Sequence, residues 1–231
     1  MNKMKKALVL MLCAVLLVVG SVLGTLAYLT SQDTVVNTFT VGDVEITLDE
    51  ANVNEMGELI DGNRVETNDY HLLPGHSYIK DPTVTIKKGS ENCYVRMQVT
   101  VADIAKMKAA FPKDDADFAG FYATYGGNEY FMLQNLVDGW NKDIWECVSI
   151  TENTNGSATY EFWYNTIAPG SATADIVLPA LFTSVEVPGA INNAQLEYLQ
   201  GAEITVVAHA IQADGFADAA AAWAAWAPEI H

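Results

Sequence analysis

The sequence predicts an all-β domain: a jelly-roll-like β-sandwich with short helical insertions and a C-terminal helix. About eight segments alternate apolar and polar residues with a period of two, which is the pattern of half-buried strands. Turn-forming Gly, Pro and Asn residues separate these segments at spacings typical of sandwiches and jelly rolls. We expect a single domain over residues 28–231, because no Pro-rich or Gly/Ser-rich linker and no internal repeat divides them.

The first 27 residues predict a secretory signal peptide. Three lysines among the first six residues precede a long apolar run. Thr25 and Ala27 then supply small residues at the third and first positions before a cut between Ala27 and Tyr28. The alternative is an uncleaved anchor, because residues 7–26 are long enough to span a bilayer. In both cases the lysines favour the cytoplasmic side, so the body of the chain lies outside the cell.

Strand-forming sequence begins directly after this signal, with hardly a linker. Its first part, "YLTSQDTVVNTFTV", runs from Tyr28 through Leu29 to Val41. Within it, alternate residues share one face: Val35, Asn37, Phe39 and Val41. The phase flips at Gly42-Asp43, after which Val44, Ile46 and Leu48 share a face. A phase change at a glycine predicts a strand with a bulge or bend.

Two further strands are predicted around the Gly89-Ser90 turn. Val84 and Ile86 point to one side before the turn. After the turn, the residues predicted to face inward are Cys93, Val95, Met97, Val99 and Val101, and those predicted to face outward are Tyr94, Arg96, Gln98 and Thr100. Asp61-Gly62-Asn63 and Leu72 to Gly75 carry turn signals.

Residues 102–140 break the β rhythm and predict a partly helical insertion. One helix is expected over 102–111, ending at Pro112, and a shorter helical piece over 133–137. The later part of the chain predicts strands at 144–150, 158–167, 181–187 and 203–212, and a short helix that ends at Gly201. Residues 214–227 predict a C-terminal helix that packs through Trp223 and Trp226 at i, i+3 spacing.

The charge of the chain excludes two classes of partner. Cleavage of residues 1–27 removes three of the 12 basic residues and no acidic one, which leaves nine basic against 29 acidic residues and a net charge near −20. Such a surface repels nucleic acid and anionic membranes. We therefore expect no nucleic-acid partner, and membrane contact only through an uncleaved signal.

Two cysteines, Cys93 and Cys147, belong to the mature chain. An exported location permits a disulfide between them. The alternative is that each is a small apolar residue in the core of a strand. A bridge requires that their Cα atoms approach within about 7 Å.

No catalytic constellation stands out, and we predict that the protein is not an enzyme. The four histidines, at 71, 76, 209 and 231, do not form HExxH, so a helical zinc site is not expected. "KDDADFAGF" lacks a third ligand and the closing glutamate of a calcium loop. The sequence also lacks GxSxG, P-loop and GxGxxG motifs. No cofactor is predicted, although an irregular calcium site among exposed carboxylates is an alternative.

The junction "GTLAYLTSQDTVVNTFTVGDVEITLDE" resembles the start of exported TasA/camelysin-like proteins of Gram-positive bacteria, which carry SipW-type signals. The segments "LLPGHSYIKDPTVTI", "CYVRMQVTV", "PALFTSVEVPG" and "AEITVVAHAIQADGF" extend the likeness over most of the mature chain. The resemblance implies a jelly-roll fold, cleavage after Ala27 by a dedicated signal peptidase, and secretion to the cell surface or extracellular matrix.

The same resemblance implies assembly into biofilm-matrix fibres, in which one subunit donates its N-terminal segment as a strand to the next. The expected partners are further copies of the chain and an accessory matrix protein. Cleavage after Ala27 would free the segment that begins with Tyr28 and Leu29, so that it can complete a neighbouring sheet. The alternatives are a monomeric surface-binding or adhesion module, with aromatic residues such as Trp163 exposed, and a camelysin-type metalloendopeptidase, which the missing zinc motif does not support.

Overall fold

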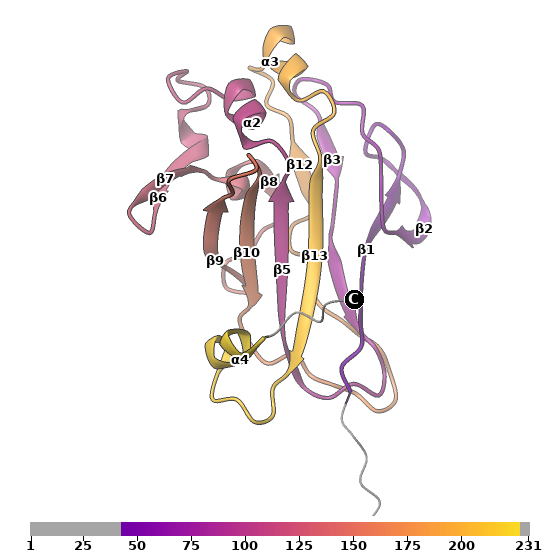
Figure 1. Cartoon of the computed structure of the whole chain (residues 1–231). Coiled ribbons are helices and arrows are strands. Elements are labelled where there is room, and N and C mark those ends of the chain that lie inside the picture. The colour runs from indigo at the N-terminus through magenta and orange to yellow at the C-terminus, as the bar shows by residue number, and fades with distance from the viewer. Residues whose placement is uncertain (1–42, 227–231) are drawn as a thin grey trace, which may run out of the picture. The chain divides into compact units, whose positions relative to one another are not determined.

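A computed structural model of the chain describes residues 43–226, and these residues form a mostly antiparallel β structure with two four-stranded sheets (Figure 1). One sheet has the strand order β11-β4-β1-β2, formed by Ile176–Val177, Thr83–Ile86, Ile46–Val53 and Leu59–Val65. The other has the order β13-β5-β10-β9, formed by Ile204–Gln212, Cys93–Val101, Ala158–Tyr164 and Trp145–Glu152. This confirms the all-β, sandwich-like class.

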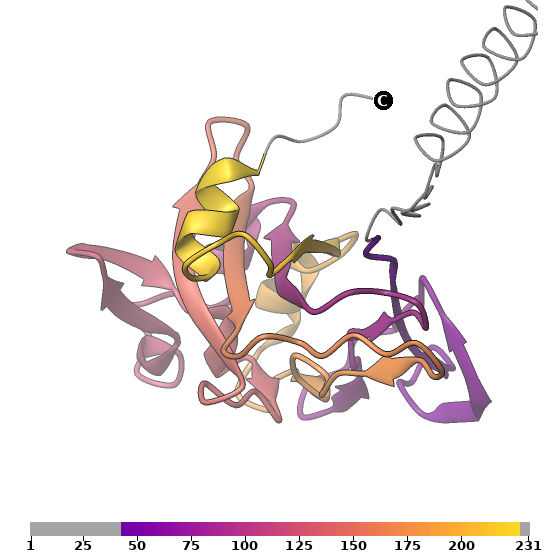
Figure 2. The ribbon, with the colours of Figure 1, turned by 90° about the horizontal axis from the view of Figure 1, so that it is seen from below.

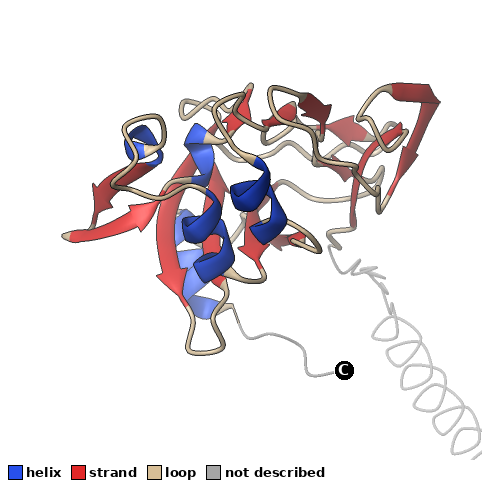
Figure 3. Ribbon diagram, turned by 90° about the horizontal axis from the view of Figure 1, so that it is seen from above, coloured by secondary structure: helices blue, strands red, loops and turns tan. Residues whose placement is uncertain are grey.

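Smaller elements cover the ends of the sheets. A three-stranded sheet has the order β3-β12-β8 (Ser77–Ile79, Ser184–Glu186 and Val137–Asp138), and β6 pairs with β7 (Tyr122–Tyr125 with Asn128–Phe131). The helices are α2 (Ile104–Ala110), α3 (Asn193–Tyr198) and α4 (Ala219–Ala225), with 3-10 turns at Ala119–Phe121 and Leu133–Asn135. Figure 3 shows α2 and α3 side by side at one end of the sheets.

The predicted helices form because their first turns are capped. The Asp103 side chain accepts a hydrogen bond from the Lys106 amide at the start of α2. Asn192 and Gln195 form a reciprocal capping box at the start of α3. Both caps satisfy amides that have no partner within the helix. The 102–140 segment is therefore partly helical as predicted, and it also contains the β6–β7 hairpin.

Strand β5 organises the main core. Its alternate residues Cys93, Val95, Met97, Val99 and Val101 are all at most 1% exposed, so the predicted inward face is confirmed. They pack with Val84 and Ile86 of β4, which are fully buried, and with Tyr160 and Phe162 of β10. A single core cluster thus joins residues from both large sheets.

The opposite face of β5 is also covered at Tyr94 and Arg96, which were predicted to face solvent. Tyr94, predicted to face solvent, is only 8% exposed, because it belongs to a second cluster with Ala213, Ala222 and Trp223. Figure 2 shows α4 lying across the outer face of the sheet, and Ala222 and Trp223 of this cluster belong to α4. The predicted C-terminal helix is confirmed, although it spans Ala219–Ala225 rather than 214–227.

A cationic side chain anchors α4 to the sheet. The Arg96 guanidinium lies 4.5 Å from the centre of the Trp223 ring and 5.5 Å from that of Trp226. Arg96 also forms an ion pair with Glu161 of β10 at 3.7 Å, and its Nε donates to Nδ1 of His209 on β13 at 3.4 Å. Cation–π contacts of this kind stabilise by about 0.5–2 kcal/mol.

Asp61-Gly62-Asn63 lie within the bounds of β2 rather than at the chain reversal, although Asp61 Oδ1 accepts from the Asn63 amide at 2.9 Å, as in a local turn. The chain reverses instead at residues 54–57, where Gly57 has φ +74° and its Cα faces Tyr78 so closely that a Cβ would come within 2.6 Å of the Tyr78 Cα. The β1–β2 register shifts between Ala51 and Val53, and this irregularity accommodates the residues of the expected turn.

Cys93 and Cys147 hold free thiols, so the disulfide considered from the sequence is not formed. Register explains why. Cys147 aligns through Phe162 with Met97 of β5, four residues from Cys93 and two strands away. The resulting separation of more than about 10 Å exceeds what a bridge can span. Burial raises the pKa of each thiol to about 11.

Several predicted features lie outside the described residues. These are the signal peptide with its cut after Ala27, and the assembly strand from Tyr28 to Val41. Within residues 43–226, no helix is long and apolar enough to cross a membrane.

Phe162→Ala should test the core. Its ring is 2% exposed on an inner strand, so we expect a loss of about 3–5 kcal/mol in the free energy of unfolding, measured by urea titration. Leu59→Ala is the control, because Leu59 is 60% exposed and should cost less than about 0.5 kcal/mol. Equal losses in the two variants would contradict this placement of the core.

Stability should fall on mild acidification because of His209. Burial, and then the charge of Arg96, lower the pKa of His209 below 6.5. At a pH between that lowered pKa and 6.5, His209 is protonated more in the unfolded chain than in the folded one. The contribution of neutral His209 to the free energy of unfolding is therefore complete above pH 6.5 and declines as the pH falls below it. His209→Gln, which cannot titrate, should show a smaller drop in urea midpoint between pH 7.5 and 5.5 than the parent. An unchanged drop would exclude His209 as its cause.

Candidate functional site

The edge of β13 that faces away from β5 is open in the described fold. β13 pairs with β5 along all nine residues, from Ile204↔Val101 to Gln212↔Cys93, and stands at the end of its sheet. Its opposite edge pairs with no described strand. An unpaired edge presents a row of main-chain donors and acceptors that can bind another strand.

Two adjoining clefts open beside the first half of this edge. The larger, of about 930 Å³, is bounded by Ile204 and Thr205 of β13, by residues 68–72, by β12, and by α2 and α3. The smaller, of about 400 Å³, is bounded by residues 204–206 of β13 and by residues 48–50 of β1. Four residues line both clefts, which makes the clefts one continuous groove: Asn68, Lys80, Ile204 and Thr205. We call it the β13 groove.

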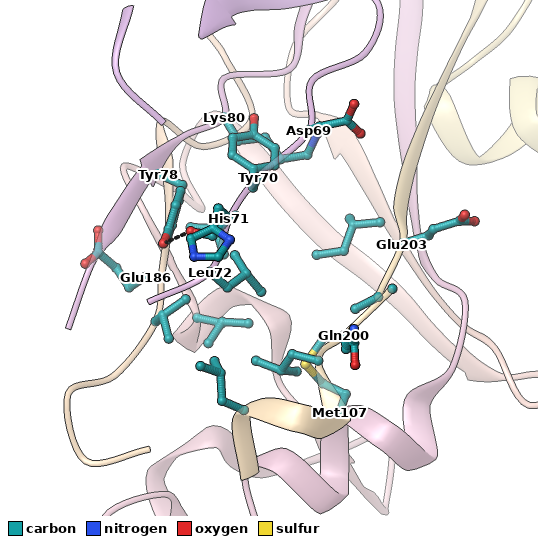
Figure 4. Close-up of a pocket in the computed structure, with 18 of the residues that line it drawn as sticks. Asp69, Tyr70, His71, Leu72, Tyr78, Lys80, Met107, Glu186, Gln200 and Glu203 are labelled. Atoms are coloured by element: carbon teal, nitrogen blue, oxygen red, sulfur yellow. Dashed lines mark hydrogen bonds between the residues drawn. The ribbon is translucent and has the colours of Figure 1, made fainter. Parts of the chain in front are cut away.

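The interior of the larger cleft is mainly apolar. Its lining includes side chains that also pack against the main core: Leu72, Met107, Phe111, Leu136, Leu196, Leu199 and Ile204. In Figure 4 Leu72 points into the cleft, whereas the carboxylates of Asp69, Glu186 and Glu203 point away from its centre. An apolar interior with a polar rim suits an extended segment that inserts alternate side chains.

A hydrogen bond fixes the wall that carries Leu72. The Tyr78 hydroxyl donates to the His71 carbonyl at 2.6 Å and accepts from the Leu73 amide at 2.6 Å, so both ends of this turn are held by one buried phenol. Tyr70 stacks edge-on against Tyr78 with ring centres 5.7 Å apart. Burial, and then the nearby charge of Glu50, raise the pKa of Tyr70 well above its usual value.

A buried polar group lies where the two clefts meet. Lys80 Nζ donates to Glu50 Oε2 at 2.7 Å, and their side chains are 13% and 7% exposed. Asn68 donates to Glu50 Oε1 at 3.0 Å and to the Ala51 carbonyl at 2.9 Å, and accepts from the Val53 amide at 3.1 Å. Asn68 therefore ties the polar group to the backbone of β1.

A second ion cluster holds β1 and β2 next to this junction. Arg64 of β2 pairs with Asp49 and, at 3.0 Å, with Asp81. Its Nη2 donates to the carbonyls of both acids. Asp81 also accepts from the Ala51 amide at 2.6 Å. The cluster fixes the strands that form one wall of the groove.

The rim of the β13 groove is acidic. Its lining includes the carboxylates of Asp49, Glu50, Glu66, Asp69, Glu186, Glu197 and Glu203. Lys80 is its one cation, and it is already paired with Glu50. A bound segment is therefore expected to carry few negative charges.

The three described histidines have separate structural positions. His71 borders the larger cleft, and its carbonyl binds Tyr78. His76 Nε2 lies 3.1 Å from the Met56 carbonyl, and His209 lies under α4, with its ring centre 5.3 Å from that of Trp226. Residues 43–226 contain no group of three His, Cys, Asp or Glu side chains placed to hold a metal ion. The acidic loop considered for calcium forms an internal turn, in which Asp115 accepts from the Asp117 amide.

Trp163, which the sequence suggested as an exposed binding residue, is half-buried. Its indole N–H donates to Glu161 at 2.6 Å, and its ring centre lies 6.5 Å from that of Trp223. Its neighbours in the strand, Tyr160 and Phe162, face the main core. The aromatic strand thus packs the domain on both faces, because α4 covers its outer side.

Comparison of the chain with protein-family models, with curated proteins and with solved structures finds no match.

Removal of one partner of the buried ion pair should destabilise the protein more than removal of both. Glu50→Gln leaves the Lys80 ammonium in a buried site without its counter-charge, so we expect a loss of about 3–5 kcal/mol by urea titration. The double variant Glu50→Gln/Lys80→Met removes both charges and should recover at least half of that loss. A double variant as unstable as the single one would show that the charge is not the cause.

Proposed function

We propose that the protein is an exported structural subunit of the cell surface or biofilm matrix. After signal cleavage, its N-terminal strand, residues 28–41, is donated to the β13 groove of a neighbouring copy. The observation that carries this proposal is the unpaired edge of β13 beside a groove with an apolar interior. The finer fold expected for such a subunit is a jelly roll.

The donated segment has properties that suit the groove. Its alternate residues Val35, Phe39 and Val41 offer apolar side chains on one face. The edge of β13 offers main-chain partners, so insertion extends the sheet in the manner of β-strand addition. The segment contains one acidic residue, Asp33, and no basic one, so it brings little charge to the acidic rim.

The direction of donation explains a fibre. The donor lies at the N-terminus of one copy, and the acceptor is the groove of another, so the contact is head-to-tail and does not close by symmetry. Repetition of a contact that does not close yields filaments. Before cleavage the segment is joined to the signal, so cleavage after Ala27 acts as the step that permits assembly.

The same groove also supports a second function, that of a monomeric surface-binding module. A cleft of about 930 Å³ is large enough for a ligand, and its acidic rim favours a segment or ligand with positive charge. In this case the N-terminal strand would not be needed for binding.

Two purified chains should separate these functions. The chain 28–231 should form filaments by electron microscopy and elute as large species in size-exclusion chromatography, whereas 38–231, which lacks most of the donor strand, should be monomeric. Monomers from both chains, across a range of salt, calcium and acidic pH, would contradict self-assembly and favour the binding module.

A mixture of the two chains provides a sharper control. The shorter chain keeps the β13 groove but cannot donate, so it should cap growing ends and shorten the filaments of 28–231 as its fraction rises. Filaments of unchanged length would indicate that the groove does not receive the strand.

A further inference from the structure

The polar group at the centre of the β13 groove is incompletely paired. An ammonium group carries three N–H donors. Lys80 Nζ has one acceptor among the described residues, Glu50 Oε2, although its side chain is only 13% exposed. Glu50 Oε1 already accepts from Asn68, and the Asn68 side-chain oxygen already accepts from the Val53 amide. Two of its three donors thus lack an acceptor among the described residues, which favours a bound segment that brings one.

The groove also has a pattern along its length. Lys80 lies at the junction of the two clefts, with the apolar wall of the larger cleft on one side and Leu48, Pro82 and Val206 of the smaller cleft on the other. A strand that follows β13 past this junction would meet an apolar site, a polar site and an apolar site in succession.

The sequence predicted for the N-terminal strand has the same pattern. The residues predicted to share one face are Val35, Asn37, Phe39 and Val41, so one polar residue interrupts an otherwise apolar row. Residues two apart on a strand are separated by about 6.6 Å, which is the scale of neighbouring side-chain sites. The Asn37 amide oxygen is a hydrogen-bond acceptor.

We propose that Lys80 of one copy and Asn37 of the next form a register lock, in which the Lys80 ammonium donates to the side-chain oxygen of Asn37. This inference rests on the proposed strand donation, and it names the positioning residues that select one alignment. A slip by one residue would turn the wrong face inward. A slip by two would place Asn37 against the apolar wall and an apolar side chain against Lys80, which leaves the Asn37 amide unpaired and the remaining Lys80 donors without an acceptor.

In coiled coils, a single buried polar residue fixes the alignment of the helices in a comparable way. Apolar side chains alone tolerate a slip by two residues, because Val35, Phe39 and Val41 all fit an apolar site. The polar pair therefore supplies alignment, whereas the apolar side chains and the main chain supply affinity.

Cysteine cross-linking in assembled chains of 28–231 tests the alignment. Thr38→Cys on the donor is combined, one at a time, with Thr205→Cys, Val207→Cys or His209→Cys on the outer face of β13, which places donor and acceptor thiols in the same chain. The parent should cross-link strongly in one combination only, and the products should form a ladder of multimers on a denaturing gel. Asn37→Val should spread cross-linking over combinations two residues apart and raise the concentration needed for assembly roughly tenfold, equivalent to about 1.4 kcal/mol.

Two conservative variants, one control and one variant without the acceptor-side charges complete the design. Asn37→Asp keeps an acceptor and should restore the single alignment. Thr34→Val makes a similar polar-to-apolar change on the opposite face and should leave the alignment unique. On the acceptor side, Glu50→Gln/Lys80→Met should spread the cross-links as Asn37→Val does, whereas Lys80→Arg should not.

The outcomes separate the lock from the proposed function. Filaments with one unchanged cross-link in Asn37→Val and in Glu50→Gln/Lys80→Met would overturn the lock and leave strand donation intact. Cross-linked chains that stay at monomer mass would show that each strand occupies its own groove, which would overturn both. Absence of filaments from the parent, together with no cross-link, would also overturn both.

Discussion

The rest of the structure depends on the burial of β5 on both of its faces. Inward, Val95, Met97 and Val99 are at most 1% exposed and join the core shared by the two large sheets. Outward, Arg96 is clamped under α4 by Trp223 and Trp226. With both faces fixed, β5 provides a rigid ladder on which β13 pairs over its whole length. β13 is therefore held firmly from one side while its other edge stays open.

This arrangement explains why a groove forms at β13. The inner face of β13 carries Ile204, Val206, Ala208 and Ala210, which pack only partly against the core. β1 bounds the smaller cleft opposite β13, but it pairs with β4 and β2 rather than with β13. An opening thus remains between the two sheets, because β1 and β13 do not pair with each other and the edge of β13 keeps its main-chain donors and acceptors free of strand partners.

The buried pair of Glu50 and Lys80 is costly for stability, because two charges lose their hydration at this opening. Hydrophobic residues of similar size would stabilise the fold at least as well. Asn68 donates to Glu50, and the cluster of Arg64, Asp49 and Asp81 fixes the adjacent strands β1 and β2, which limits the pair's freedom to rearrange. A fixed polar group in an apolar groove suits recognition better than it suits stability, and this favours a binding role for the site.

The sequence predicted most strands because period-2 alternation reports burial on one face, as at Cys93 to Val101. It failed where tertiary contacts override local signals. Asp61-Gly62-Asn63 has the composition of a turn, but Gly57 closes the reversal because Tyr78 leaves room for no side chain. The groove itself could not be predicted: Glu50, Asn68 and Lys80 are separated in sequence and have no motif, and only the folded sheets bring them together.

Charge adds a last constraint on assembly. Without residues 1–27 the chain carries a net charge near −20, so two copies repel each other at separations within a Debye length of about 8 Å at physiological ionic strength. The segment that we propose is donated, residues 28–41, has Asp33 as its single charged residue and adds almost nothing to that repulsion. In the proposed fibre, the free energy of assembly must then come from the inserted strand, through main-chain hydrogen bonds to β13 and burial of Val35, Phe39 and Val41. Because this gain is local and the repulsion is spread over the surface, salt should strengthen assembly without changing where the strand binds.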